Sequence, residues 1–170
     1  SSDNGPTYNG GTDSLYFDSA APFKSDYGWG KGTVHEGGIR VPMIASWPGK
    51  IVEGRTSDHI SAFWDVLPTL CAVSGAKAPQ DIDGISFLPT LLGQGGQPAH
   101  EFLYWEFPSY TGQQAVRMGD WKAIRMNIFK DNKDIQLFNL ATDPTEQLNV
   151  AAGNPEVVEK INSILEQEHT

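Results

Sequence analysis

The sequence has little cysteine, little positive charge and no long apolar run. Its single cysteine excludes an internal disulfide framework and a multi-cysteine metal site. With 12 Lys and Arg against 21 Asp and Glu, the net charge of −9 argues against nucleic acid or an anionic membrane surface as partner. No window approaches about 18 consecutive apolar residues, so we expect no membrane span, and no signal peptide is visible. Cys71 lies in the apolar run DVLPTLCAVSG, which predicts a buried structural thiol.

The first half of the chain begins with a polar segment and continues with one strand and one helix. Residues 1–38 are rich in Gly, Asn, Asp and Ser, and a segment of this length without aliphatic runs is typical of functional or disordered chain. Residues 39–46 are mostly apolar and bounded by turn signals, which predicts a short, mostly buried strand. Apolar residues then recur at helical spacing over 66–73. Asp65 is placed to cap that helix and Gly75 to end it.

The second half predicts a small antiparallel sheet with a helix on it. After residue 100, aromatic and β-branched segments alternate with turn signals, and AVRMGDWKAIR is typical of a tight hairpin. In NPEVVEKINSILEQEH, Asn154 is placed as the N-cap and Pro155 at the first helical position. One apolar stripe follows at helical spacing, formed by Val157, Val158, Ile161, Ile164 and Leu165. The fold class is α/β, and α+β within this chain: we predict the end of an α/β domain over 1–98 and a sheet-plus-helix subdomain over 99–170.

Near the start of the chain, Asp3 and Asn4 place two oxygen donors side by side. A carboxylate next to a side-chain amide suits a hard cation such as Ca²⁺ or Mg²⁺ better than zinc. Two ligands are too few for Ca²⁺, which takes about six to eight oxygens. Asp-Asn-Gly is also a common turn, so composition alone leaves a turn and half of a cation site as alternatives.

Lys31 stands between glycines in the stretch GWGKGT. Glycines on both sides let the backbone approach a ligand closely, and the ammonium can then meet an anion as a point charge. The P-loop pattern GxxxxGK[ST] is absent, because Gly32 follows Lys31 where Ser or Thr is needed. An anion-binding lysine and a flexible surface lysine both fit this pattern.

Other residues carry weaker signals. His35 and Glu36 form an adjacent pair suited to acid–base or hydrogen-bonding work, although neighbours in sequence point in different directions. The cations Arg117, Lys122 and Arg125 on the expected hairpin can meet an anion or serve as edge charges that prevent sheet-to-sheet association. The aromatic cluster over 104–110 can stack on sugar rings or belong to the core.

Several blocks, in order, resemble a known family. SDNGP, then GKGTVHEGGIRVPMIASWPGKI, then FWDVLPTLCAVSGA resemble the C-terminal half of the type I sulfatases, the formylglycine-dependent members of the alkaline phosphatase superfamily. The tail, with GDWKAIR and LFNLATDPTEQLNVA before the last helix, is similar to the C-terminal subdomain of that family. The resemblance covers essentially all 170 residues. It implies the tail of an alkaline-phosphatase-like α/β sandwich followed by a small antiparallel sheet.

The resemblance also implies a division of labour in the hydrolysis of a sulfate ester. Asp3 and Asn4 correspond to two ligands of a single Ca²⁺, and Lys31 to a sulfate-binding residue. The formylglycine nucleophile is made from a C/S-x-P-x-R motif, which this sequence lacks. We therefore expect the nucleophile in a missing N-terminal half of the same polypeptide, and no sulfatase activity from this chain alone. The full-length protein is expected to be periplasmic or secreted.

The sequence also suggests which residues contact the substrate, and it leaves two alternative functions open. We expect a catalytic contribution from His35 and substrate contacts from Trp29, Glu36 and Arg117. A sulfated sugar is favoured over a small aryl ester, because the loop over 7–30 offers several aromatic rings. The alternatives are a two-zinc phosphodiesterase or phosphatase of the same superfamily, and a non-catalytic carbohydrate-binding module that uses the aromatics over 104–110.

Overall fold

A computed structural model describes residues 1–169 of the chain, which divide into two compact units. Unit 1 combines Ser1–Met43 with the chain from Phe102 onward, and unit 2 is Ile44–Glu101. Residues 1–43 thus belong with the sheet, whereas the sequence analysis grouped them with the rest of 1–98. The predicted domain boundary near residue 98 stays a prediction. Within residues 1–169, no helix has the length and apolar character needed to cross a membrane.

Unit 1 is built on a four-stranded antiparallel sheet in the order β1-β2-β3-β4. The strands are β1 (Leu103–Phe107), β2 (Gln113–Met118), β3 (Trp121–Met126) and β4 (Gln136–Asn139). Met118 pairs with Trp121, so β2 and β3 are joined by a two-residue turn. Gly119 in that turn has φ +58°, a conformation that glycine adopts without a Cβ clash. The predicted hairpin is confirmed.

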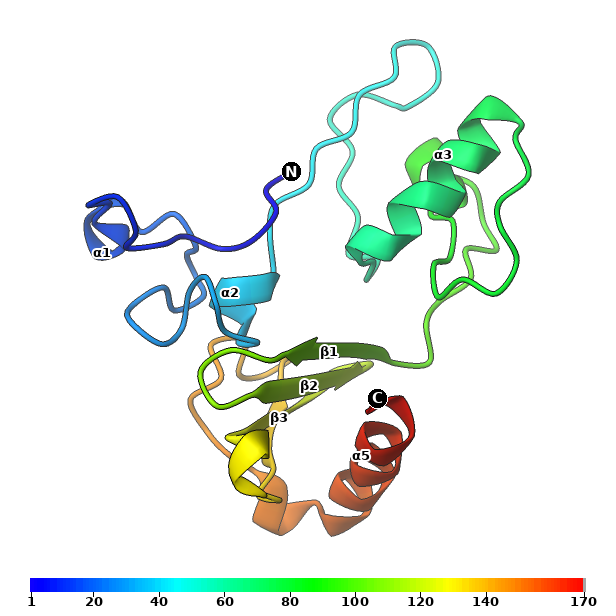
Figure 1. The fold of residues 1–170 in the computed structure, drawn as a ribbon. Coiled ribbons are helices and arrows are strands. Elements are labelled where there is room, and N and C mark those ends of the chain that lie inside the picture. Colours follow the sequence, from blue (N-terminus) through cyan, green and yellow to red (C-terminus); the bar gives the residue numbers. More distant parts are fainter. Residues whose placement is uncertain (170) are drawn as a thin grey trace. The chain divides into compact units, whose positions relative to one another are not determined.

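The helix α5 (Pro155–Glu168) covers one face of the sheet, as Figure 1 shows. Its Ile161, Ile164 and Leu165 are buried against Val116 and Leu137 of the strands. The predicted amphipathic helix and its stripe are therefore confirmed. Asn154 precedes the helix without a side-chain cap; its Nδ2 donates instead to the carbonyl of Val150 at 2.8 Å.

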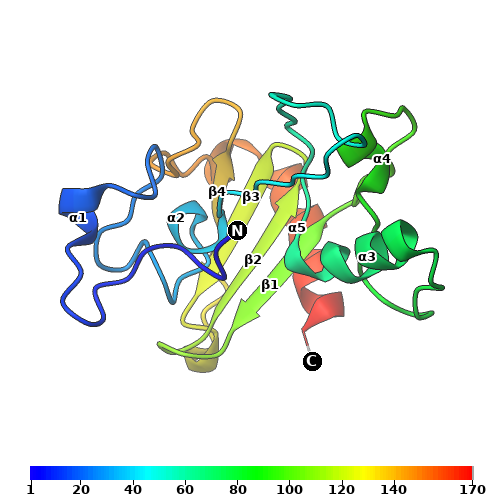
Figure 2. The same ribbon diagram turned by 90° about the horizontal axis from the view of Figure 1, so that it is seen from above.

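The opposite face of the sheet carries the N-terminal segment of unit 1. Val34 packs there with Ala115, Ile124, Phe138 and Leu140. Two short helices lie in this segment, α1 (Ser14–Phe17) and α2 (Glu36–Ile39). Figures 1 and 2 show α2 on the side of the sheet opposite α5. Because side chains alternate along a strand, residues of β2 and β3 are divided between an α5 face and an α2 face.

The strand predicted over residues 39–46 is not present. α2 ends at Ile39, and the following residues have no regular secondary structure; Met43 and Ile44 are 50% and 89% exposed. A strand needs a partner to which it donates and from which it accepts hydrogen bonds. The four strands of unit 1 pair only with one another, and Pro42 has no backbone N–H to contribute.

Unit 2 contains the helices α3 (Val66–Ser74) and α4 (Leu88–Leu92) and a 3-10 turn over Phe63–Asp65. α3 confirms the predicted helix and ends, as expected, at Gly75 with φ 74°. The expected buried Cys71 is half-buried instead, because apolar positions along α3 such as Leu70 are exposed rather than packed. Asp65 does not cap α3 through its side chain; its carboxylate bonds elsewhere within the unit.

Candidate functional site

The backbone of unit 1 brings the first residues of the chain alongside Lys31. The amide of Gly5 donates to the carbonyl of Gly38 at 2.9 Å, and the amide of Lys31 donates to the carbonyl of Pro6 at 2.8 Å. The first bond fastens the segment that carries Asp3 and Asn4 to α2, and the second fastens it to the loop that carries Lys31. The structure thus gathers the expected metal ligands and the expected sulfate-binding residue in one part of unit 1.

Glycines make this close packing of backbone segments feasible. A Cβ on Gly5 would lie 1.7 Å from the carbonyl oxygen of Gly37, and one on Gly30 would lie 2.5 Å from that of Pro6. A Cβ on Gly37 would lie 1.7 Å from the carbonyl oxygen of Lys24. Distances this short are incompatible with any side chain, since backbone cannot yield as a flexible side chain does. Gly5, Gly30 and Gly37 therefore allow one backbone segment to pack directly on another.

The side chains of Asp3 and Asn4 suit a hard cation. Asp3 is exposed, and its carboxylate has no hydrogen bond or ion pair with another residue of 1–169. Asn4 donates from Nδ2 to the carbonyl of Gly5 at 2.9 Å, which leaves its Oδ1 available as a ligand. The described chain has no group of three or more His, Cys, Asp or Glu side chains able to hold a metal. The pair therefore fits as part of an oxygen shell of the kind Ca²⁺ takes.

Lys31 is exposed, and its ammonium has no ion pair within the described residues. Its backbone is nevertheless fixed by the bond to Pro6. A lysine with a fixed backbone and an unpaired ammonium can neutralise an anion without first breaking a salt bridge.

His35 and Trp29 pack against each other. The His35 ring is 6% exposed, and its centroid lies 4.0 Å from that of Trp29. Lys24 Nζ is 4.0 Å from the Trp29 ring centroid, and His35 Nδ1 is 3.4 Å from Glu146 Oε2. These neighbours in unit 1 thus show His35 packed between Trp29 and Glu146; its expected catalytic role and the substrate contact of Trp29 stay predictions.

A buried ion-pair network lies beneath this segment. Lys122 of β3 is fully buried, and its Nζ lies 2.8 Å from Glu36 Oε1 and 2.9 Å from Glu146 Oε1. The amide of Glu36 also donates to Glu146 Oε2 at 2.8 Å. Burial would raise the pKa of Glu146, but the nearby His35 ring and the charge of Lys122 hold that pKa below its ordinary value. The network thus fixes α2 to the sheet.

Two arginines complete the charge balance around Glu36. Arg40 Nη1 and Arg117 Nη1 lie 3.3 and 3.7 Å from Glu36 Oε2. Burial lowers the pKa of Arg117, while the charge of Glu36 opposes that shift. Glu36 is 2% exposed and paired with three cations, which gives it a structural role in unit 1; its expected substrate contact stays a prediction. Arg117, an expected substrate contact, lies in the same network.

Sequence reasoning missed the roles of Lys122 and Glu146. It treated Lys122 as an anion ligand or an edge charge, whereas the side chain is the centre of the buried network. The signal was present in β3. Lys122 lies two residues before Ile124, and side chains two apart in a strand point to the same face, so Lys122 shares the buried face of Ile124. Nothing comparable marked Glu146, which lies in a loop far from Lys122 in the sequence.

Comparison with known proteins places this chain in a family. The model for "N-sulphoglucosamine sulphohydrolase, C-terminal" matches residues 25–170. Human arylsulfatase A is 35% identical over 162 residues, covering 79% of this chain and 31% of that protein. An ulvan-active sulfatase of Formosa agariphila is 45% identical over 170 residues, covering 79% and 33%. The chain belongs to this family of sulfatase C-terminal domains, and it spans about one third of the length of these relatives.

Solved structures give the same result for the fold. The crystal structure of Ps i-CgsB is similar with a TM-score of 0.78 and 28% identity, over 96% of this chain and 34% of that one. BT4656, solved with its substrate D-glucosamine-2-N,6-O-disulfate, is similar with a TM-score of 0.59 and 27% identity, over 71% and 26%. The sheet with its C-terminal helix is thus a sulfatase fold element, as the sequence blocks implied.

Proposed function

We propose that this chain is the C-terminal part of an enzyme that hydrolyses sulfate esters, and that it supplies one wall of the active site. The supporting observation is that the exposed carboxylate of Asp3, the unused Oδ1 of the half-buried Asn4 and the unpaired ammonium of Lys31 are carried by backbone segments bonded to each other. Membership in a sulfatase family supports the proposal that Asp3 and Asn4 bind a cation and that Lys31 binds the sulfate group.

In this proposal, Lys31 binds the sulfate group of the substrate. The ammonium offsets charge on the sulfate and on the ester oxygen as the S–O bond breaks, which is where electrostatic stabilisation is most effective. Asp3 and the Oδ1 of Asn4 hold part of the shell of a Ca²⁺, which when bound acts as a Lewis acid. The nucleophile, a formylglycine, lies outside this chain, so we expect no hydrolysis of 4-nitrophenyl sulfate by the chain alone.

We propose a sulfated carbohydrate as the substrate class. Tyr8, Tyr16, Phe17 and Tyr27 of the N-terminal segment are exposed, the last at 88%. Tyr8 and Tyr27 have ring centroids 6.4 Å apart, and Tyr16 and Phe17 lie edge to face. Exposed rings of this kind offer flat apolar faces for sugar rings. The similarity to the ulvan-active sulfatase and to the structure with a sulfated glucosamine supports the same class.

The role of Lys31 is tested by turnover of the full-length enzyme on 4-nitrophenyl sulfate and a panel of sulfated saccharides. We expect Lys31→Ala to lower kcat/KM by about 100- to 1,000-fold, the range for loss of one electrostatic contact to the transition state. Lys50→Ala, at another exposed lysine, is the matched control and should leave turnover unchanged. Equal turnover of the two variants would reject the assignment.

The cation is tested by metal analysis of the same enzyme. We expect one Ca²⁺ per chain, and its loss together with activity in Asp3→Ala. Asp134→Ala, at an exposed aspartate of the loop after β3, should retain the metal. Two zinc ions in place of one calcium would instead favour a phosphohydrolase.

A further inference from the structure

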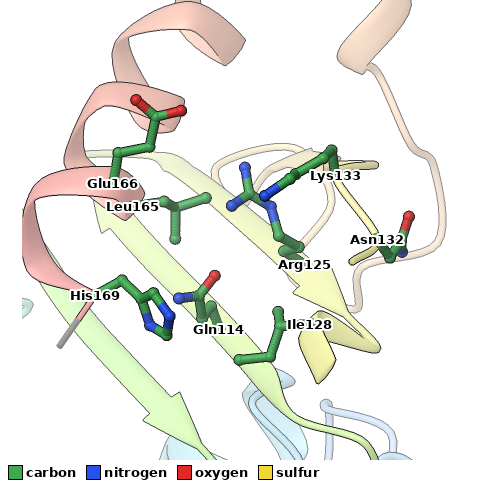
Figure 3. Close-up of a pocket in the computed structure, with 8 residues that line it drawn as sticks. All are labelled: Gln114, Arg125, Ile128, Asn132, Lys133, Leu165, Glu166 and His169. Atoms are coloured by element: carbon green, nitrogen blue, oxygen red, sulfur yellow. The ribbon is translucent and has the colours of Figure 1, made fainter. Parts of the chain in front are cut away.

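A pocket lined by both polar and apolar residues lies on the α5 side of the sheet, away from the face that carries α2. Its volume is about 190 Å³, and Figure 3 shows it between α5, the two central strands and the loop after β3. The lining residues used below are Gln114, Arg125, Lys133, Glu166 and His169. Nothing in the proposed sulfate-ester chemistry uses this pocket.

Arg125 is the unusual member of the pocket. Its side chain extends from β3 to the α5 face, and the residue is only 7% exposed. One guanidinium nitrogen donates to Asn162 Oδ1, but the buried Nε has no hydrogen-bond partner. No carboxylate within residues 1–169 forms an ion pair with it. Arginine keeps its charge in proteins, so this is a desolvated cation with an unused donor.

The remaining charges favour an anion. Lys133 lines the pocket from an exposed loop, where its Nζ is 3.2 Å from Asp131. His169 Nδ1 is 2.9 Å from Glu106, which leaves its Nε2 free of that contact. Glu166 is the one carboxylate among the lining residues, and it forms no ion pair with Arg125 or another residue of 1–169.

The donors of Gln114 are already used. Its Nε2 donates to the hydroxyl of Tyr104 at 3.0 Å and to Glu106 Oε2 at 3.1 Å. Arg125 therefore provides the main free donor at the base of the pocket, with Lys133 as a second cation at its edge.

We propose that this pocket binds a small tetrahedral oxyanion, with the Arg125 guanidinium as its principal donor and Lys133 as a supporting charge. Such an anion supplies the counter-charge that the guanidinium lacks within residues 1–169, through the charge-assisted bonds that arginine makes with oxyanions. The ligand is a sulfate group, either free inorganic sulfate or a sulfate carried by a saccharide. The pocket is distinct from the Lys31 site and does not depend on the proposed hydrolysis.

The test is calorimetric titration of the full-length enzyme carrying Lys31→Ala, so that binding at the proposed active site does not contribute. Sodium sulfate is titrated at constant ionic strength set with chloride. We expect saturable binding of one sulfate, weakened at least tenfold by Arg125→Met and a few-fold by Lys133→Ala. Lys130→Ala, an exposed lysine of the same loop that does not line the pocket, should leave the affinity unchanged.

Two further measurements test whether the variants are folded and which form of sulfate the pocket binds. A melting curve shows whether Arg125→Met is folded, and Lys133→Ala gives an independent test if it is not. Titration with a monosulfated glucosamine distinguishes the sources: tighter binding than inorganic sulfate identifies a saccharide ligand, and weaker binding identifies the free ion. Absence of saturable binding, or equal affinity in Arg125→Met and Lys130→Ala, would overturn the proposal whatever the outcome for Lys31.

Discussion

The two units of the chain differ in what holds each together. In unit 1, apolar residues of the strands, α5 and the N-terminal segment are buried on both faces of the sheet. In unit 2, Phe87 and Pro68 are the apolar residues described as buried, while Phe63, Leu67 and Leu70 are 50–58% exposed. Unit 1 therefore gains its stability from apolar burial, the dominant favourable contribution to folding, and unit 2 gains little from it.

Polar contacts organise unit 2 instead. Asp65 is 1% exposed and accepts from the amides of Ala62 and Ile85, both at 2.7 Å. His100 Nε2 lies 2.9 Å from the same carboxylate. One buried side chain thus connects the start of α3, the loop before α4 and the end of the unit. A polar centre of this kind fixes the arrangement of segments but adds little net stability, because each bond replaces one to water.

The largest expected effect is at the buried charges of unit 1. Lys122→Ala leaves Glu36 and Glu146 buried without their shared cation, and we expect the free energy of unfolding to fall by about 3–5 kcal/mol. Urea denaturation followed by tryptophan fluorescence measures this change. Lys133→Ala, which breaks an exposed pair with Asp131, should be close to the parent protein. Similar values for the two variants would show that the network contributes no more than a surface pair.

The difference in apolar burial predicts unequal costs for truncation in the two units. Ile161→Ala in α5 removes a fully buried side chain and should lower the free energy of unfolding by about 2–5 kcal/mol. Leu67→Ala in α3 removes a half-exposed side chain and should cost much less. Chemical denaturation of both variants gives the comparison, and an equal cost would remove the distinction between the units.

Removing the buried carboxylate of Asp65 should destabilise unit 2 locally. Asp65→Ala leaves the amides of Ala62 and Ile85 without their acceptor, at a cost of about 1–3 kcal/mol for each buried unsatisfied group. We expect faster amide hydrogen exchange in α3 and α4, with exchange in β2 and β3 unchanged. Acceleration throughout both units would show that they unfold together.

The smallest expected effect is in the pH dependence of unit 1. The pKa of Glu146 is below its ordinary value of 4.5 in the folded chain, so its contribution to stability is full above that value. The contribution is lost as pH falls through the lower, folded pKa, because the folded state then takes up the proton as well. Glu146→Gln should show a shallower loss of stability below pH 4.5 than the parent chain. Parallel acid profiles would contradict this.

Local signals were sufficient for the sheet, the hairpin and α5. Period-two and helical patterns decide those elements, and their partners lie within the chain. The strand expected over 39–46 could not be decided locally, because a strand exists only with a partner, and Met43 and Ile44 are exposed here. For the site, the sequence blocks indicated Asp3, Asn4 and Lys31 as a set. The burial of Glu36 with Lys122 and Glu146 depends on long-range contacts that no local pattern contains.

These buried charges are central to the account, since α2 and the segments bonded to it carry the residues assigned to the site. The most direct test is hydrogen exchange at the amides of Gly5 and Lys31, whose bonds to Gly38 and Pro6 fasten those segments together. In Lys122→Met, we expect both amides to lose protection by a larger factor than the amides of α5. Unchanged protection at Gly5 and Lys31, or a loss no greater than that of α5, would contradict the claim that the network holds the site in place.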